Sequence, residues 1–325
     1  MMNVLHKLSN VINDFPAYVK RYIWPLPKYK REVVVMIDGK HCHGGLTDRF
    51  SLIMSVYSYC KVHEIPFKLY YVYPCDLTEI LLPNEYDWEI KADELSYSIF
   101  DSEDLYLYPL PLPLELKSVG FLKYNDCLYH ERLRQCVAPG KHKQYHVYGN
   151  AFFARGDFKN LWNELFKPSV YLEKRLNAVR NLLAQPYEAI TLRFQQLLGD
   201  FKEGEYEVLD EKERQALIDK CVKKIDSLYT NGYFSTKKVL VTSDSSSFLD
   251  IIRQKDYVYT VPGKMEHMDY TANHDLDMNT KSFVDLYMLS EAKRVTLLKV
   301  GKMYRSGFPR FAAELGEADY ELIEM

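Results

Sequence analysis

The chain lacks the long apolar runs and the strong charge that mark several large classes of protein. No apolar stretch approaches the ~18 residues that a membrane-spanning helix needs. Residues 1–8 also lack the apolar centre of a signal peptide. The net charge of −3 argues against a general nucleic-acid binder. These absences favour a cytoplasmic protein with no nucleic-acid partner.

The sequence is also poor in arrangements that hold a metal. The six cysteines form no CxxC pair, and we expect them to be reduced and buried. No Asp-x-Asp triplet follows a predicted strand, and the single literal match, at 275–277, lies in a polar stretch before a helix. His41 and His43 lack a further ligand at suitable spacing. We therefore predict no metal site and no cofactor.

What the chain does have is length and regular alternation. With 325 residues, 47% of them hydrophobic, it can form two domains with cores of their own. In the first half the pattern predicts strands at 32–38, 67–73 and 144–148 and helices at 47–63 and 126–137. Residues 106–116 carry three prolines, so we expect an extended surface segment there.

The second half repeats this alternation. Residues 157–183 are predicted to be helical, broken at Pro168, and to cross between the domains. Strands are predicted at 187–194, 238–242, 257–261 and 294–298, and helices at 208–229, 245–253, 281–292 and 309–316. Recurring strand–helix units imply parallel sheets that bind ligands at the carboxyl ends of their strands. We predict an α/β protein with two Rossmann-like domains, 1–165 and 166–325, whose sheets face each other across a cleft.

The first 31 residues differ from the rest. They hold six basic residues and one acidic residue, with apolar residues at helical spacing and several aromatics. A basic, aromatic segment of this kind can lie on an anionic membrane surface. The alternative is an N-terminal helix docked on the body of the protein. The first interpretation predicts peripheral contact with the inner face of the membrane through residues 1–31.

A glycine pair between a predicted strand and a predicted helix is the most informative motif. Gly44 and Gly45 let the backbone approach a ligand closely, and helix-start amides suit an anion. Arg49 would add a planar positive charge at the mouth of this loop. A tight structural turn is the other interpretation. The helix after the turn should bury one side, formed by Phe50, Ile53, Met54, Tyr57 and Cys60.

Two further segments place polar residues on or after apolar strands. Arg193 lies in an apolar strand, where a buried guanidinium needs a phosphate or a carboxylate as partner. Asp200 is the internal candidate for that partner. Asp244 and Ser245 end the next predicted strand, where an aspartate can cap a helix or hold a nucleoside hydroxyl or base edge.

The last such segment opens the final predicted helix. Ser306 and Gly307 would offer exposed amides and a hydroxyl to a phosphate, and Arg310 adds charge one turn further on. In the preceding helix the apolar residues face the core, which leaves Asp285 able to cap or pair nearby.

Taken together, these segments resemble the α1,6-/α1,2-/protein O-fucosyltransferase superfamily, most of all small bacterial members that modify surface polysaccharides or oligosaccharides. Gly44 to Arg49 resembles the first glycine loop of that superfamily, and Thr191 to Phe194 resembles its His-x-Arg strand. Residues 242–245 resemble its Asp motif near the nucleoside, and 283–292 with 304–313 resemble its last motif. One position departs from the pattern, because Thr191 stands where the family has a histidine.

The resemblance implies a GT-B fold and metal-independent, inverting transfer of fucose from GDP-fucose to a glycan acceptor. It implies an acceptor side in the first domain and a donor side in the second. Arg193 would neutralise the leaving diphosphate, and Asp48 or Asp200 would take the acceptor proton. The implied donor-binding residues are Gly44, Gly45, Arg49, Arg193, Asp244, Ser245, Ser306, Gly307 and Arg310.

Two other functions fit the same sequence. A GT-B enzyme could use a different nucleotide sugar, since the family histidine is absent at Thr191. A non-catalytic sugar- or nucleotide-binding homologue is the third interpretation, in which Thr191 marks the loss of chemistry. Binding without turnover would separate this third interpretation from the two enzymes.

Overall fold

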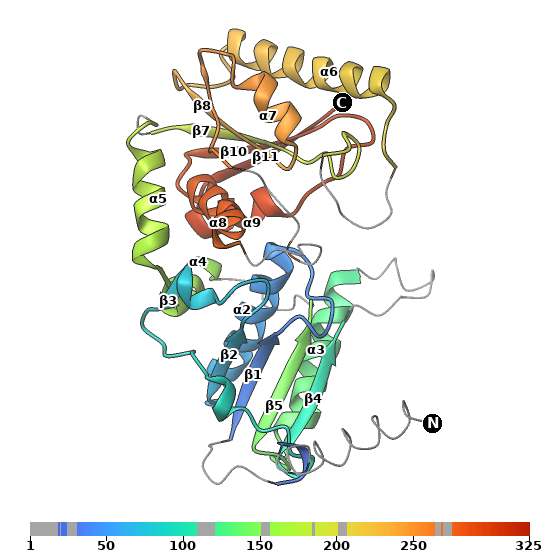
Figure 1. The fold of residues 1–325 in the computed structure, drawn as a ribbon, viewed down its shortest axis with the longest axis vertical. Helices are drawn as coiled ribbons and strands as arrows, with labels where there is room; N and C mark the ends of the chain where they lie inside the picture. Colours follow the sequence, from blue (N-terminus) through green and yellow to red (C-terminus); the bar gives the residue numbers. More distant parts are fainter. Residues whose placement is uncertain are drawn as a thin grey trace, which may run out of the picture. The chain divides into compact units, whose positions relative to one another are not determined.

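The structure is a computed structural model that describes residues 19, 21–24, 31–108, 121–150 (121–127 as backbone only), 157–183, 186–200, 207–263, 268 and 275–325. The chain divides into two compact units. The first comprises Met1–His43, Asp48–Val72 and Tyr86–Gly156, and the second comprises Gly44–Thr47, Tyr73–Glu85 and Asp157–Met325. Each unit has a parallel sheet of its own (Figure 1), so the predicted α/β fold class is confirmed.

The first unit is built on a sheet with the strand order β2-β1-β5-β4. All neighbouring strands in it are parallel, and Val35 of β1 pairs with Leu69 on one side and Val147 on the other. β1 and β5 are buried at every position, as expected for central strands of a parallel sheet. The strands are β1 (Glu32–Ile37), β2 (Phe67–Tyr71), β4 (Ser102–Leu107) and β5 (Gln144–Gly149).

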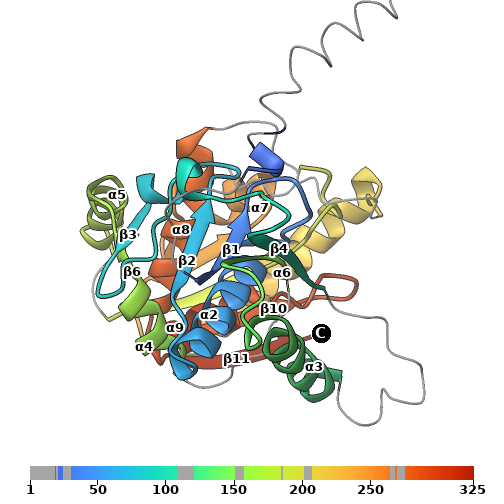
Figure 2. The ribbon, with the colours of Figure 1, turned by 90° about the horizontal axis from the view of Figure 1, so that it is seen from below.

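Two helices connect these strands. α2 (Leu46–Val62) leads from β1 to β2, and α3 (Phe121–Val137) leads from β4 to β5. Both crossovers run in the same direction along the sheet, so the usual right-handed connection puts both helices on one face (Figure 2). The side of α2 predicted to be apolar is fully buried: Phe50, Ile53, Met54, Tyr57 and Cys60.

Among the described residues, the opposite face of this sheet is covered by an irregular segment. Residues 86–97, with the short helix η2 (Ala92–Glu94), run across it. Ile90 and Leu95 from this segment pack against Val34, Met36 and Tyr148 of the sheet.

The second unit has the strand order β11-β10-β7-β8-β9, again with every pair parallel. The chain runs from β7 through β8 to β9, and then returns to the other side of β7 to form β10 and β11. The order of the strands therefore reverses between β7 and β10. The strands are β7 (Glu188–Leu192), β8 (Val239–Ser243), β9 (Val258–Tyr259), β10 (Arg294–Lys299) and β11 (Asp319–Glu324).

Helices cover both faces of this second sheet. Figure 1 shows α6 (Glu211–Thr230) and α7 (Ser246–Ile252) on one face and α8 (Leu276–Ser290) and α9 (Phe308–Gly316) on the other. α5 (Val170–Arg180) joins the second layer, where Arg180 pairs with Glu291 just beyond α8. The core under α6 and α7 includes Ile190, Leu192, Val241, Ile225 and Phe248.

The segment that joins the two halves of the chain belongs to the second unit. β3 (Leu81–Pro83) pairs with β6 (Phe166–Pro168) in an antiparallel ladder. α4 (Phe158–Leu165) rests on α8 and α9, because Phe158 contacts Phe311 and the Trp162 indole donates to the Tyr287 hydroxyl at 3.3 Å. The predicted first domain, 1–165, includes α4, whose apolar side packs within the second unit.

The predicted elements are present, with shifted ends. The strand predicted at 187–194 ends at Leu192, so Arg193 is the first residue after β7 and not a residue within it. α8 begins at Leu276, ahead of the predicted start at 281, because Asp275 caps it by accepting from Asp277 N at 2.8 Å. β3, β4, β6 and β11 were not predicted.

The expected burial of the cysteines holds only in part. Cys60, Cys75 and Cys221 are buried, but Cys42 is exposed in the turn after β1 and Cys136 is half-buried on α3. None of the described cysteines forms a disulfide. Across the described ranges, no helix combines the length and the apolar character needed to cross a membrane. The predicted membrane segment, 1–31, lies almost wholly outside these ranges.

Candidate functional site

Three of the predicted site segments lie at one edge of the second sheet. Arg193 follows β7, Asp244 follows β8, and Ser306 with Gly307 lies between β10 and α9. Because β10, β7 and β8 are parallel neighbours, their carboxyl ends share this edge. The strand order reverses between β7 and β10, which is where open α/β sheets bind their ligands.

Asp244 shapes the turn that carries Arg193. Its buried carboxylate accepts hydrogen bonds from Phe194 N at 2.9 Å and from Gln195 N at 2.7 Å. Gln195 has a φ of +53°, a left-handed conformation that is uncommon outside glycine. The two hydrogen bonds hold the backbone in this turn, and the turn sets the direction of the Arg193 side chain.

Arg193 and Asp244 also form an ion pair. Arg193 Nε lies 3.4 Å from Asp244 Oδ2, and the arginine side chain is 17% exposed. Burial raises the pKa of Asp244 above its ordinary value, while Arg193 and the two backbone amides oppose this rise. Arg193 is thus paired with Asp244, whereas the sequence had pointed to Asp200 as its internal partner. Asp244 follows β8, which neighbours β7 in the sheet, so the strand order determines which carboxylate meets Arg193.

Asp200 instead anchors the start of α7. Its Oδ2 accepts from Ser245 Oγ at 2.9 Å, from Ser247 N at 2.8 Å and from Ser247 Oγ at 2.5 Å. Ser245 is the N-cap of α7, and its hydroxyl accepts from Phe248 N at 3.1 Å. Among the described residues, Asp200 Oδ1 has no hydrogen-bond partner although it is buried.

The start of α9 provides an open helix N-terminus. Gly307 is the N-cap, and a Cβ built on it would meet no described atom within 4 Å. Ser306 Oγ accepts from Phe308 N at 3.2 Å. Tyr304 N donates to the Arg193 carbonyl at 3.1 Å, which joins this loop to the turn after β7. Because Phe308 N is bonded to Ser306 and Pro309 has no N–H, the exposed N-cap Gly307 offers its own amide to an anion.

Two arginines near the N-cap Gly307 are both exposed. Arg310 Nε bonds Glu314 Oε1 at 2.9 Å, so its charge is shared along the outer side of α9. Arg305 lies closer to the N-cap Gly307, yet sequence reasoning did not single it out. Arg305 could have been identified from the sequence, because a basic residue just before the start of a helix favours anion binding.

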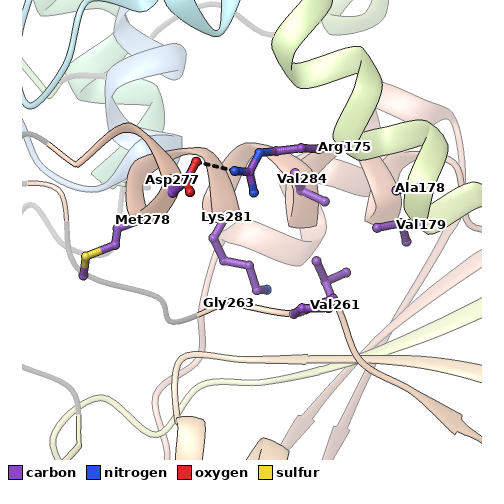
Figure 3. A pocket seen from close by; sticks show the side chains of 10 residues that line it. Arg175, Ala178, Val179, Val261, Gly263, Asp277, Met278, Lys281 and Val284 are labelled. Atoms are coloured by element: carbon purple, nitrogen blue, oxygen red, sulfur yellow. Dashed lines mark hydrogen bonds and ion pairs between the residues drawn. The ribbon is translucent and has the colours of Figure 1, made fainter.

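A pocket of about 390 Å³ opens in the second unit between α5, α8 and the residues after β9 (Figure 3). One wall is Lys281, whose side chain is 3% exposed and paired with the buried Asp285. Burial raises the pKa of Asp285, against the opposing effect of Lys281. Arg175 and Asp277 pair at the rim. Since β9 neighbours β8, the pocket lies on the same edge of the sheet as Asp244.

In the glycine loop, Gly44 has a φ of +73°, so this position does need glycine. Arg49, however, is fully buried in the first unit, where its Nη1 donates to the Tyr71 hydroxyl at 3.2 Å. The expectation that Arg49 meets a ligand at the mouth of the loop stays a prediction. Helical spacing places this residue on the inner side of α2. Asp48 is exposed in the first turn of α2, where a carboxylate complements the helix dipole.

Metal binding finds no support in side-chain grouping. Among the residues that the structure describes, no group of three or more His, Cys, Asp or Glu could hold an ion. His43 is buried, and its Nε2 accepts from Gly39 N at 3.1 Å.

Comparisons with known proteins bear on the fold. No protein-family profile matches the sequence, and no curated protein matches it. The structure does match NodZ α-1,6-fucosyltransferase soaked with GDP-fucose, with a TM-score of 0.53, 12% identity, and coverage of 88% of this chain and 93% of that one. A second match is fucosyltransferase NodZ from Bradyrhizobium, with a TM-score of 0.52, 12% identity, and 87% and 92% coverage.

A plant structure matches as well. A point mutant of Arabidopsis thaliana FUT1 in complex with GDP has a TM-score of 0.50 and 13% identity, with 95% of this chain and 74% of that chain covered. Two parallel α/β units, the second with a reversal of strand order, define a doubly wound class of α/β fold. Within that class, the fold of this chain is that of the GT-B fucosyltransferases, as expected from its motifs.

Proposed function

We propose that this protein is a glycosyltransferase that transfers fucose from GDP-fucose to a glycan acceptor with inversion. The observation that carries the proposal is the edge where Arg193, held by Asp244, adjoins the open N-terminus of α9. This edge offers a planar cation and the amide of the exposed N-cap Gly307 to a diphosphate. The NodZ structure soaked with GDP-fucose has the same fold over most of both chains.

In this proposal the donor edge stabilises the leaving group. Bond cleavage at the sugar develops negative charge on the diphosphate, and Arg193 with the amide of Gly307 would meet that charge as it forms. Arg305 adds a second cation in the same loop. The nucleoside would extend past Asp244 toward the pocket beside Lys281 at the end of β9.

The proton of the acceptor hydroxyl needs a carboxylate, and two candidates remain. Oδ2 of Asp200 already accepts three hydrogen bonds at the start of α7, so only its Oδ1 could take a proton. Asp48 is exposed in the first turn of α2. The acceptor side is assigned to the first unit and the donor side to the second. A role in surface polysaccharide or oligosaccharide synthesis, at the inner face of the membrane, completes the proposal.

One observation favours the alternative functions. Thr191, at the position of the family histidine, is buried, and its Oγ1 lies 2.8 Å from Thr242 Oγ1. The two hydroxyls bond each other, so no titratable group stands at this position. A different nucleotide sugar, or binding without turnover, would be consistent with this change.

GDP should raise the melting temperature more than UDP or CDP does at equal concentration. The second unit should bind the diphosphate of each, and the pocket beside Lys281 should select among the bases. A ligand at about 100 times its Kd adds roughly 2.7 kcal/mol to the free energy of unfolding, which thermal-shift measurements resolve easily. A larger shift with UDP would contradict the proposal that GDP-fucose is the donor. A GDP shift without release of GDP from GDP-fucose, with any glycan acceptor, would favour the non-catalytic homologue.

Transfer should persist in the presence of EDTA. The cations at the donor edge, Arg193 and Arg305, belong to the protein, so we expect no divalent ion to be needed for charge neutralisation. The test compares initial rates of GDP release with and without chelator on one preparation. Abolished turnover that Mn²⁺ or Mg²⁺ restores would contradict this expectation.

A further inference from the structure

The first unit carries a cluster of aromatic and charged side chains that the donor edge does not use. It lies at the carboxyl ends of β1, β5 and β4, which are neighbours in the sheet. Tyr106 of β4 pairs in register with Tyr148 of β5, and His41 and Asp38 follow β1. We call this group, with Lys40 and Asp104, the tyrosine platform.

Aromatic packing makes the platform rigid. The rings of Tyr106 and Tyr148 are stacked, with centroids 5.6 Å apart and planes inclined by 18°. His41 packs edge-on against both, at 4.7 Å from Tyr148 and 5.2 Å from Tyr106. Tyr148 is 2% exposed, whereas Tyr106 is 36% exposed. The platform therefore presents the Tyr106 ring to solvent, beside the exposed His41, on the buried ring of Tyr148.

Hydrogen-bonding groups of both signs surround this ring. Lys40 Nζ lies 2.9 Å from Asp38 Oδ2, and half of the lysine side chain is exposed. The Tyr148 hydroxyl donates to the same carboxylate at 3.4 Å. Asp104, beside Tyr106 on the outward side of β4, is half exposed and lies 3.4 Å from His146 Nδ1. The neighbouring His146 lowers the pKa of Asp104, which keeps this carboxylate an acceptor at neutral pH.

This combination suits one class of ligand. A pyranose ring has a face of polarised C–H groups that packs against the electron-rich face of an aromatic ring. Its hydroxyls need donors and acceptors around that ring, which an ammonium and a carboxylate supply. The carboxylates of Asp38 and Asp104 would repel a phosphate backbone, so a stacked nucleic-acid base fits less well.

We propose that the tyrosine platform binds a pyranose unit of the acceptor, with the sugar's C–H face on Tyr106 and its hydroxyls toward Lys40 and Asp104. The proposal rests on the proposed function, because it supplies the acceptor side of that reaction. It assigns a neutral saccharide as the ligand of the first unit.

Saturation-transfer NMR on the full chain tests the platform. The probes are the methyl β-glycosides of glucose, galactose and N-acetylglucosamine. We expect saturation of at least one of them in the wild type, and a loss of about tenfold in affinity in Tyr106→Ala. Tyr106→Phe should keep the signal because it keeps the ring. The matched control is Phe100→Ala, an aromatic that is 66% exposed at the other end of β4.

The proposal that the tyrosine platform binds a saccharide fails if saturation is unchanged in Tyr106→Ala. It also fails if the wild type saturates none of the three glycosides. The thermal shift with GDP, measured on the same samples, separates this result from the donor assignment. It should be equal in the wild type and in Tyr106→Ala. Glycoside binding that depends on Tyr106, without any GDP shift, would support the platform and overturn the donor site alone.

Discussion

Arg193→Ala should lower the rate of sugar transfer by ~10²–10³-fold, the typical effect of removing one preorganised contact to developing charge. Arg193 lies at the point where the strand order reverses, and Tyr304 N donates to its carbonyl from the loop before α9. Removing the guanidinium leaves the amide of Gly307 and the exposed Arg305 to face the diphosphate. Initial rates of GDP release, with donor saturating, measure the effect.

The same substitution should make stability depend more steeply on pH. Without Arg193, the main opposition to the raised pKa of Asp244 is lost. A carboxyl whose pKa is raised by folding binds its proton more tightly in the folded state. The proton on Asp244 stabilises the folded protein fully at pH values below the unfolded-state pKa, near 3.8. This stabilisation declines as the pH rises through the folded-state pKa. The variant should thus match the wild type in acid and lose roughly 3 kcal/mol near neutral pH.

Two further variants test this prediction. Arg193→Lys should recover much of the stability but little of the rate, since a point charge cannot replace a planar fork. Asp244→Asn in the Arg193→Ala background should flatten the dependence of unfolding free energy on pH. An Arg193→Ala protein of normal activity would remove the main support for the donor edge.

Gly316→Ala should destabilise the second unit by more than ~3 kcal/mol, or prevent folding. A Cβ on Gly316 would stand 1.6 Å from the Ser290 carbonyl oxygen, where α9 meets the end of α8. The clashing atom belongs to the backbone, so neither helix can yield without moving as a whole. Gly307→Ala, at the other end of α9, is the matched control, because its Cβ would enter open space. Equal urea midpoints for Gly316→Ala and the wild type would refute the close helix contact.

The local sequence predicted the buried strands well, because a short, mainly apolar run such as residues 239–243 is typical of a buried strand. It missed β11, where charged residues alternate along an edge strand that is never fully buried. It missed β4 because only Leu105 and Leu107 are buried and prolines come directly after them. Strands at the margin of a sheet leave a weaker apolar signal than central ones.

The site divides in a similar way. Arg193, Asp244 and Ser306 were predicted because each interrupts or ends an apolar element. The pairing of Arg193 with Asp244 depends on β7 and β8 being neighbours, and no local pattern encodes that order. Lys281 escaped notice since a lysine in a helix normally faces water, and here it is buried with Asp285.

The antiparallel pair β3–β6 has a consequence for how this chain can be divided. Residues 73–85 belong to the second unit, although they are flanked in sequence by segments of the first. A fragment that starts at residue 157 would contain β6 but not its partner, and Ser169 would lose its hydrogen bond to the Glu79 carbonyl. No single cut therefore yields both units intact. To exchange the second unit of this chain for that of a related fold, residues 73–85 would have to be exchanged as a separate, second piece.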